Sequence, residues 1–172
     1  MSELFSNFRR AANRAKNVKP YQGDLLVLDP GETTGWAIFS ATTESAHLRR
    51  CGQASTWPFD TCYEQLSKLL AEFSGRKAER LLVLYESYNV YAHKLSQHTH
   101  SEVPTIQIIG CVQTLCAQYK LQTITQNAQT GKSFCKDSKL HNWAFYEPGM
   151  KHARDAIRHG AHFLLFGHKD FS

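Results

Sequence analysis

Short apolar runs, separated by polar stretches, divide the chain into predicted strands and helices. The first three runs, residues 24–29, 35–40 and 47–54, have the length of strands. Pro30-Gly31 forms a tight turn after the first of them, so the three strands are expected to make an antiparallel meander. Residues 24–29 are apolar almost throughout, which is typical of a strand that is buried on both faces.

The rest of the chain alternates between helical and extended periodicity. The predicted order is helix, strand, helix, strand, short helix and final helix, at residues 59–73, 81–85, 106–119, 121–125, 138–145 and about 150–166. Residues 87–103 are polar, rich in histidine and aperiodic, and are predicted as a loop. The pattern therefore predicts an α/β fold with a mixed five-stranded sheet, a three-stranded antiparallel meander plus parallel strands, flanked by helices.

Composition narrows the class of protein. A chain of 172 residues fits one domain, and its 42% hydrophobic and 20% charged residues are ordinary for a soluble globular protein. No apolar stretch is long enough to span a membrane, and the N-terminus lacks the apolar core of a secretory signal. The five cysteines form no CxxC pair, which favours buried, reduced thiols in a reducing compartment.

Most of the net charge of +5 is concentrated before the first apolar run. Residues 1–20 contain a single acid, Glu3, and five basic residues, Arg9, Arg10, Arg14, Lys16 and Lys19. An inert solvated tail, an arm that contacts nucleic-acid phosphates and an organelle transit peptide all fit this composition. We predict a flexible basic leader at residues 1–20, followed by one folded domain at residues 21–172.

Acidic residues end two of the predicted buried strands. Asp29 closes the first strand, and Glu86 follows the apolar run 81–85. Burying an unpartnered carboxylate costs several kcal/mol, and a bound cation is one way to offset that cost. Ligand sites of α/β sheets lie beyond the carboxyl ends of parallel strands, where both acids fall.

The final helix adds further candidates. Asp155 follows His152 by three residues and precedes His159 by four, so these side chains share one helix face. Each candidate also has a structural interpretation: Asp29 as a turn cap, Glu86 as a solvated strand end, the histidines as surface residues, and Asp155 as an ion-pair partner of Lys151, Arg154 or Arg158. Their occurrence together favours a functional site.

The order of these residues resembles a known family. The segment Asp29-Pro30-Gly31-Glu32-Thr33-Thr34-Gly35-Trp36-Ala37 resembles the first-strand motif of RuvC-type Holliday junction resolvases, in the ribonuclease H-like superfamily. Leu84-Tyr85-Glu86-Ser87 resembles their second acidic strand, and His152-Ala153-Arg154-Asp155-Ala156 their C-terminal helix. The turn after Asp29 is one residue shorter than in many bacterial members, as in the bacteriophage branch. His152 stands where some members carry Asp.

The resemblance implies a ribonuclease H-like nuclease domain that hydrolyses phosphodiester bonds in four-way or other branched DNA, with a role in DNA recombination and repair. It implies two Mg²⁺ ions held by the catalytic residues Asp29, Glu86, His152 and Asp155. Mn²⁺ is expected to substitute, because imidazole suits softer ions. The candidate DNA-binding residues are Lys132, Lys136, Lys139, Tyr88, Tyr91, Arg9 and Arg10.

The resemblance also implies a homodimer, because a four-way junction needs two symmetric cuts. The predicted helix at 106–119 is apolar around more of its circumference than one core-facing stripe requires, so it either contacts a second copy or is fully buried. Branched DNA is the expected partner, with no membrane and no small-molecule substrate. The expected location is the cytoplasm, in a bacterial host infected by bacteriophage.

Other functions remain open at this stage. A related nuclease acting on flaps, forks or RNA, and a non-catalytic DNA-binding module with a decayed site, would show the same pattern. Sugar kinases and actin-like proteins also carry an Asp-x-Gly-x-Thr turn, but they need two such domains. This chain is too short for two.

Overall fold

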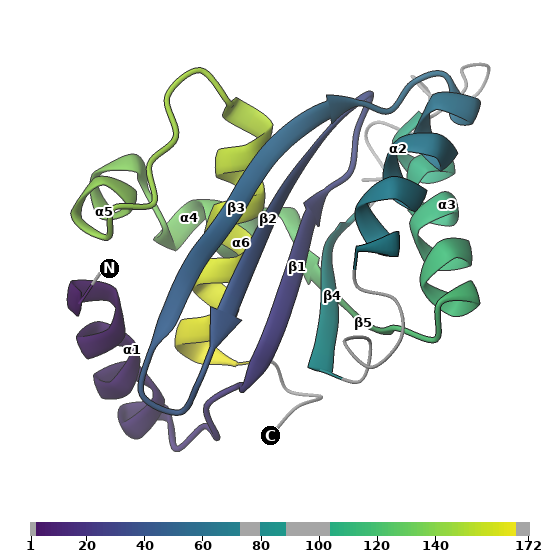
Figure 1. Ribbon diagram of the computed structural model, residues 1–172. Coiled ribbons are helices and arrows are strands. Elements are labelled where there is room, and N and C mark those ends of the chain that lie inside the picture. The colour runs from purple at the N-terminus through teal and green to yellow at the C-terminus, as the bar shows by residue number, and fades with distance from the viewer. Residues whose placement is uncertain (1–2, 73–79, 89–103, 168–172) are drawn as a thin grey trace.

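The computed structural model describes residues 3–72, 80–88 and 104–167 (Figure 1). Its helices and strands are α1 (Glu3–Lys16), β1 (Gly23–Asp29), β2 (Thr33–Ala41), β3 (Ala46–Ser55), α2 (Phe59–Ala71), β4 (Leu81–Ser87), α3 (Pro104–Gln118), β5 (Gln122–Asn127), α4 (Ala128–Phe134), α5 (Asp137–Asn142) and α6 (Lys151–Phe166). The strands form one sheet in the order β3-β2-β1-β4-β5. β1 pairs antiparallel with β2 and parallel with β4, which confirms the predicted mixed sheet.

Helices cover both faces of the sheet. In Figure 1, α2 and α3 lie on one face, and α6 lies on the other with α1, α4 and α5. The alternation of side chains along β1 divides the core accordingly, since successive residues of a strand point to opposite faces. Leu25 and Val27 pack on the α6 side, whereas Leu26 and Leu28 pack on the α2–α3 side, and all four are fully buried. The prediction that this strand is buried on both faces is confirmed.

Helix α6 lies unusually close to the sheet at two glycines. A Cβ added to Gly160 would lie 2.4 Å from Cε2 of Phe39, and one added to Gly35 would lie 2.0 Å from the carbonyl oxygen of His152. Real Cβ atoms do not tolerate such distances, so both positions need glycine for steric reasons. The contact at Gly35 brings the first turn of α6 onto the carboxyl end of β1.

The prediction of a flexible leader is wrong for residues 3–16. These residues form α1, whose Phe5 is fully buried against Trp143 and Phe145, at ring-centroid distances of 5.1 and 4.8 Å. An apolar anchor of this size fixes the helix on the α6 side of the core.

The predicted DNA contact of Arg9 is also wrong. This side chain is only 1% exposed, and its guanidinium donates hydrogen bonds to four carbonyl oxygens, those of Tyr21, Thr42, Ser45 and Leu164, at 2.7–3.1 Å. A guanidinium has five N–H donors and no acceptor, so a ring of carbonyls satisfies it inside the protein. Arg9 therefore joins α1 to the β2–β3 turn and to the end of α6, and is not accessible to DNA.

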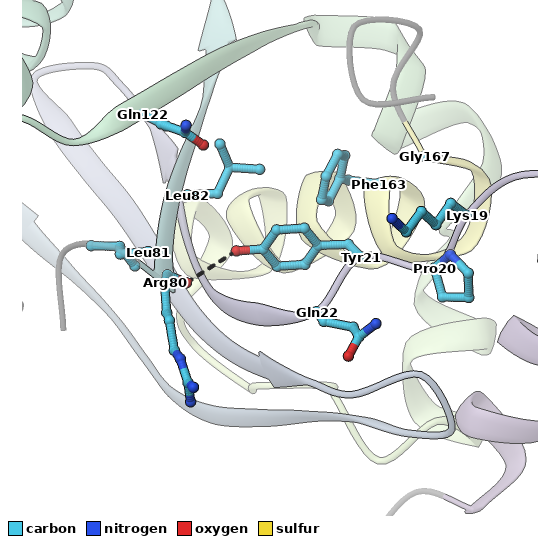
Figure 2. Close-up of a pocket in the computed structure, with 10 residues that line it drawn as sticks. All are labelled: Lys19, Pro20, Tyr21, Gln22, Arg80, Leu81, Leu82, Gln122, Phe163 and Gly167. Carbon is cyan, nitrogen blue, oxygen red and sulfur yellow. Dashed lines mark hydrogen bonds between the residues drawn. The ribbon is translucent and has the colours of Figure 1, made fainter. Parts of the chain in front are cut away.

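A pocket of about 360 Å³ lies beyond the amino ends of β1 and β4, at the edge opposite to Asp29 (Figure 2). The Tyr21 hydroxyl donates to the carbonyl oxygen of Asp24 at 2.7 Å and also lies 3.3 Å from that of Arg80. These contacts occupy the Tyr21 hydroxyl within the protein. Ligand sites in such sheets form at the other edge.

The composition led to two further predictions, one on the cysteines and one on membrane spans. All five cysteines are free thiols, and four of them are buried, in agreement with the predicted reduced state. Within the ranges that the structure describes, none of the helices has the length and apolarity needed to cross a lipid bilayer.

Candidate active site

A single row of residues across the sheet carries the site. Asp29 pairs with Gly35, Gly35 pairs with Gln53, and Glu86 pairs with Gln126. Leu28 and Tyr85 are also paired, so the residues that follow them, Asp29 and Glu86, are neighbours. Paired residues on adjacent strands point to the same face. All members of this row therefore face α6.

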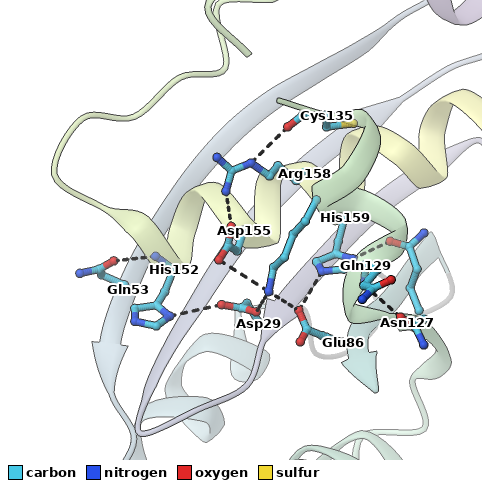
Figure 3. Close-up of polar contacts among 12 residues, drawn as sticks. Asp29, Gln53, Glu86, Asn127, Gln129, Cys135, His152, Asp155, Arg158 and His159 are labelled. Carbon is cyan, nitrogen blue, oxygen red and sulfur yellow. Dashed lines mark hydrogen bonds and ion pairs between the residues drawn. The ribbon is translucent and has the colours of Figure 1, made fainter. Parts of the chain in front are cut away.

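The first turn of α6 is attached to this row (Figure 3). The backbone N–H of His152 donates to Oε1 of Gln53 at 3.3 Å, and its ring Nδ1 lies 3.3 Å from Oδ2 of Asp29. Between these two contacts, the backbone carbonyl of His152 lies against Gly35, where a residue with a Cβ would not fit. This arrangement places Asp155, one turn further along α6, over the same acids.

The three predicted acids come together around one ammonium group. Nζ of Lys132 lies 2.8 Å from Oε2 of Glu86, 3.6 Å from Oδ1 of Asp29 and 3.6 Å from Oδ2 of Asp155. Asp29 and Asp155 are buried, at 6% and 7% exposure. The structure thus brings together all four residues that the sequence singled out as ligands, from β1, β4 and α6.

The pKa values of the two strand-end carboxyls are shifted in opposite directions, although both groups are buried. Burial raises the pKa of Asp29, and a hydrogen bond with Glu86 and the nearby carboxylates raise it further against the effect of Lys132. Burial also acts to raise the pKa of Glu86, but hydrogen bonds from His159 and Lys132 outweigh it and lower that pKa. Crowded carboxyls of this kind cannot all ionise without cations. A divalent ion would reverse the balance and favour the ionised forms.

His159 is a site residue that the sequence placed on the same helix face as Asp155 but that was not included in the predicted ligand set. Its ring is fully buried, with Nε2 2.9 Å from Oε2 of Glu86 and Nδ1 2.6 Å from Oε1 of Gln126. Atoms of Asp29, Glu86 and His159 lie within 4.8 Å of one another, close enough to share a metal ion. The helical spacing from Asp155 was an available signal for His159. Gln126 had none, because only the sheet register places it there.

Arg158 binds Asp155 of α6 through Oδ1, the carboxylate oxygen that does not face Lys132. Its NH1 group donates to Oδ1 of Asp155, its NH2 group donates to Asp137 of α5, and its Nε donates to the carbonyl of Cys135 at 3.1 Å. The ion pair that the sequence offered as a structural interpretation of Asp155 is therefore present. It leaves Oδ2 of Asp155 facing the other acids.

The candidate DNA-binding residues do not form one cluster. Lys132 lies among the acids, Lys136 is exposed at the start of α5, and Nζ of Lys139 lies 3.2 Å from the centre of the Phe134 ring. Arg10 pairs with Glu44 at 3.5 Å, in the β2–β3 turn at the opposite end of the sheet. Tyr88 directly follows β4, and Tyr91 lies outside the described residues.

No family model matches this chain, and no curated protein matches it in sequence. Solved structures do match it. Thermus thermophilus RuvC in complex with a Holliday junction substrate has a TM-score of 0.62 and 13% identity, over 83% of this chain and 94% of that one. The yeast mitochondrial Holliday junction resolvase has a TM-score of 0.55 and 9% identity, over 97% and 93%. The fowlpox virus Holliday junction resolvase has a TM-score of 0.52 and 12% identity, over 82% and 97%.

These likenesses show the fold, because the identities are too low to carry more. The mixed five-stranded sheet with helices on both faces is a ribonuclease H-like fold, as the sequence predicted. A fold of this kind supports different functions, so the function has to be argued from the site.

Proposed function

We propose that this protein is a metal-dependent endonuclease that resolves four-way or other branched DNA. One observation carries the proposal: the carboxylates of Asp29, Glu86 and Asp155 converge at the carboxyl ends of the central strands. The fold supports it, since the structural neighbours named above are Holliday junction resolvases, and one of them is bound to its junction substrate. The three motifs that resemble the RuvC type coincide with the residues that converge.

The donor atoms fit hard divalent cations. We propose Asp29, Glu86, His152 and Asp155 as ligands of two Mg²⁺ ions, with His159 close enough to Asp29 and Glu86 to join them. Carboxylate oxygens are the donors that Mg²⁺ prefers, and imidazole nitrogens extend the preference toward Mn²⁺. Bound divalent ions supply charge neutralisation and Lewis acidity to phosphodiester hydrolysis.

The protein's own residues preorganise this site. Glu86 is held by His159, which is itself held by Gln126, and Asp155 is held by Arg158. Such outer contacts fix the orientation of ligand groups and are costly to remove. Gln53 fixes the start of α6, so that His152 faces Asp29. The carboxylates therefore do not need to be gathered when a substrate arrives.

The test uses labelled four-way junction, duplex, flap, fork and RNA–DNA hybrid, each with Mg²⁺, Mn²⁺ or EDTA. We expect metal-dependent cutting of the junction. The Asp29→Asn variant should bind the junction but cut it at least about a thousand-fold more slowly, because it loses a charge needed to hold the ions. Asp24→Asn, the same change at the other end of β1, is the matched control and should cut normally. Undiminished cutting by Asp29→Asn would rule out the mechanism.

The same panel separates the alternatives. Preferential cutting of flaps, forks or RNA–DNA hybrid would identify a related nuclease of this fold with another substrate. Binding of the junction by the wild-type protein without cutting in either metal would identify a DNA-binding module with a decayed site. Integrity of the acid cluster favours catalysis over the latter.

We further propose that the protein acts as a homodimer through α2 and α3. Phe59 and Tyr63 on α2 and Ile106 on α3 are large apolar side chains that are 44–48% exposed. A groove of about 470 Å³ lies between the two helices. Exposed apolar surface of this kind is typical of an interface. Sedimentation equilibrium should give a dimer for the wild type and a monomer for Tyr63→Glu; two monomeric species would refute the proposal.

The biological setting also remains a proposal. The shortened turn after Asp29 supports the bacteriophage branch and, with it, the cytoplasm of an infected bacterium. Immunoblots of fractionated cells before and after infection would test this, and detection in uninfected cells would contradict it.

A further inference from the structure

Lys132 reaches the acid cluster because α4 packs unusually close to α6. A Cβ added to Gly131 would lie 2.9 Å from the backbone nitrogen of His159 and 3.0 Å from the carbonyl carbon of Arg158. Glycine therefore permits the close contact between these helices. The next residue is Lys132, whose side chain extends from this contact to the three acids.

The ammonium of Lys132 lies where a cation has the most to gain. Within 3.6 Å it meets one oxygen each of Asp29, Glu86 and Asp155. It donates a hydrogen bond to Oε2 of Glu86, the same atom that contacts His159. A divalent ion would need these oxygens as ligands. The ammonium and the ion would therefore compete for the same oxygen lone pairs. The ammonium and a divalent ion held by the same oxygens would also repel each other.

The side chain has a way out of the cluster. It is 36% exposed, whereas those of Asp29 and Asp155 are 9% exposed. Lysine carries its charge on a flexible four-carbon stem, so the ammonium can leave while α4 stays in place. Arg158 is different, because its guanidinium also binds Asp137 and the carbonyl of Cys135. Of the two cations, Lys132 is the one suited to displacement.

We propose that Lys132 is an internal counter-ion that occupies the acid cluster in the absence of metal and must be displaced when divalent ions bind. This inference rests on the metal-dependent function proposed above and adds a regulatory property to the same site. Lys132 keeps the acids together in the metal-free protein, and it raises the metal concentration needed to load the site.

Direct measurement of Mn²⁺ binding tests the competition. Free Mn²⁺ is quantified by electron paramagnetic resonance during titration of the wild type and of Lys132→Met. A state that is only partly competent to bind shows a reduced apparent affinity, so Lys132→Met should bind Mn²⁺ about ten-fold more tightly than the wild type. Lys68→Met removes the same charge from an exposed pair with Glu64 on α2, and should bind like the wild type.

Thermal unfolding provides a second measurement. Without metal, Lys132→Met should melt at a lower temperature than the wild type, because its acids repel one another without a counter-ion. The rise in melting temperature on adding Mn²⁺ should be larger for Lys132→Met than for the wild type. Lys132→Gln retains a polar side chain, and should show the same larger rise if Lys132→Met folds poorly without metal.

The outcomes separate the two proposals. Binding of Mn²⁺ by both proteins with equal affinity, or more weakly by Lys132→Met, overturns the counter-ion and leaves the metal-dependent function intact. Failure of both proteins to bind Mn²⁺ overturns the function and the counter-ion together. Binding by Lys132→Met alone supports the counter-ion in its strongest form.

Discussion

The two faces of the sheet are built in different ways. The α2–α3 face consists of aliphatic and cysteine side chains such as Leu66, Val112 and Cys116, with Tyr85 at its edge. The α6 face combines aromatic rings with buried polar groups, among them Arg9 and His159. Each of these polar groups has a partner within the protein. The α2–α3 face is held together by apolar packing. The α6 face also holds charged and polar groups in fixed positions, as the proposed hydrolysis would require.

The space around glycine differs in the same sense between three positions on the α6 side and Gly110 on α3. On the α6 side, a Cβ added to Gly35, Gly131 or Gly160 would lie less than 3 Å from a neighbouring atom. Gly110 on α3 has nothing within 4 Å of that position. The α6 side is therefore fitted at the level of single methyl groups at these three glycines. The α2–α3 side has free space at Gly110, although a Cβ added to Gly52 would lie 2.6 Å from Trp36.

The largest expected effect comes from adding one methyl group to each face. Gly35→Ala places a Cβ against the backbone of His152, so α6 must shift away from Asp29. We expect a loss of about 3 kcal/mol or more in the free energy of unfolding, together with loss of junction cutting. Gly110→Ala should instead gain about 0.5–1 kcal/mol, because alanine is the better helix residue. Urea denaturation measures both changes.

This pair is informative because the chemical change is the same. Equal effects of the two substitutions on stability would show that the close approach at Gly35 is not what positions α6. Retention of full cutting activity by Gly35→Ala would lead to the same conclusion for the site.

The next largest effects should separate a loss of cutting activity from a loss of folding stability. His159→Asn removes the ring that holds Glu86, and loss of such an outer contact typically lowers activity or metal affinity by about 10–100-fold. Leu115→Ala on the other face should cost about 2–5 kcal/mol of stability but leave the cutting rate of the folded protein unchanged. Single-turnover cutting rates and urea denaturation, measured on both variants, check this contrast. A slower rate in Leu115→Ala and not in His159→Asn would reverse the roles assigned to the two faces.

The same difference explains what could be predicted from the sequence. The strands and the helices of the α2–α3 face were predicted closely, because periodic apolar residues are a local signal. Asp29 and Glu86 were found because they interrupt such runs. Helix α1 was missed because a buried arginine and an exposed one look alike in sequence. Arg9 is recognisable as internal only once the carbonyls of Thr42 and Ser45 surround it.

Within the site, the residues that sequence could not supply are those placed by tertiary contacts. Gln126 is positioned by the pairing of β4 with β5, and Lys132 by the contact of α4 with α6. The short helix α4 itself was not predicted, since its seven residues, six of them polar or small, carry no helical periodicity. The proposed ligand set followed from local patterns, whereas the groups that contact it, such as Gln126 and Lys132, required the structure.

The smallest expected effect is a dependence of stability on pH that only the α6 face should show. Burial lowers the pKa of His162 to about 4, with further lowering from His159 and Lys16. On the other face, burial raises the pKa of Cys62 and Cys116 to about 12, so these thiols stay neutral from pH 7 to pH 5. Acidification over this range should therefore act through His162 and not through the thiols.

The sign follows from proton uptake. Between pH 6.5 and pH 4 the unfolded chain protonates His162 while the folded protein does not, so acidification favours unfolding in this window. Because the side chain is partly exposed, we expect His162 to account for only about 1 kcal/mol of the stability lost between pH 7 and pH 5. His162→Asn should lose less stability over that range than the wild type, whereas Cys116→Ala should lose as much. Urea denaturation at the two pH values measures the difference, and identical losses in His162→Asn and the wild type would show that this partly buried imidazole does not link folding to pH.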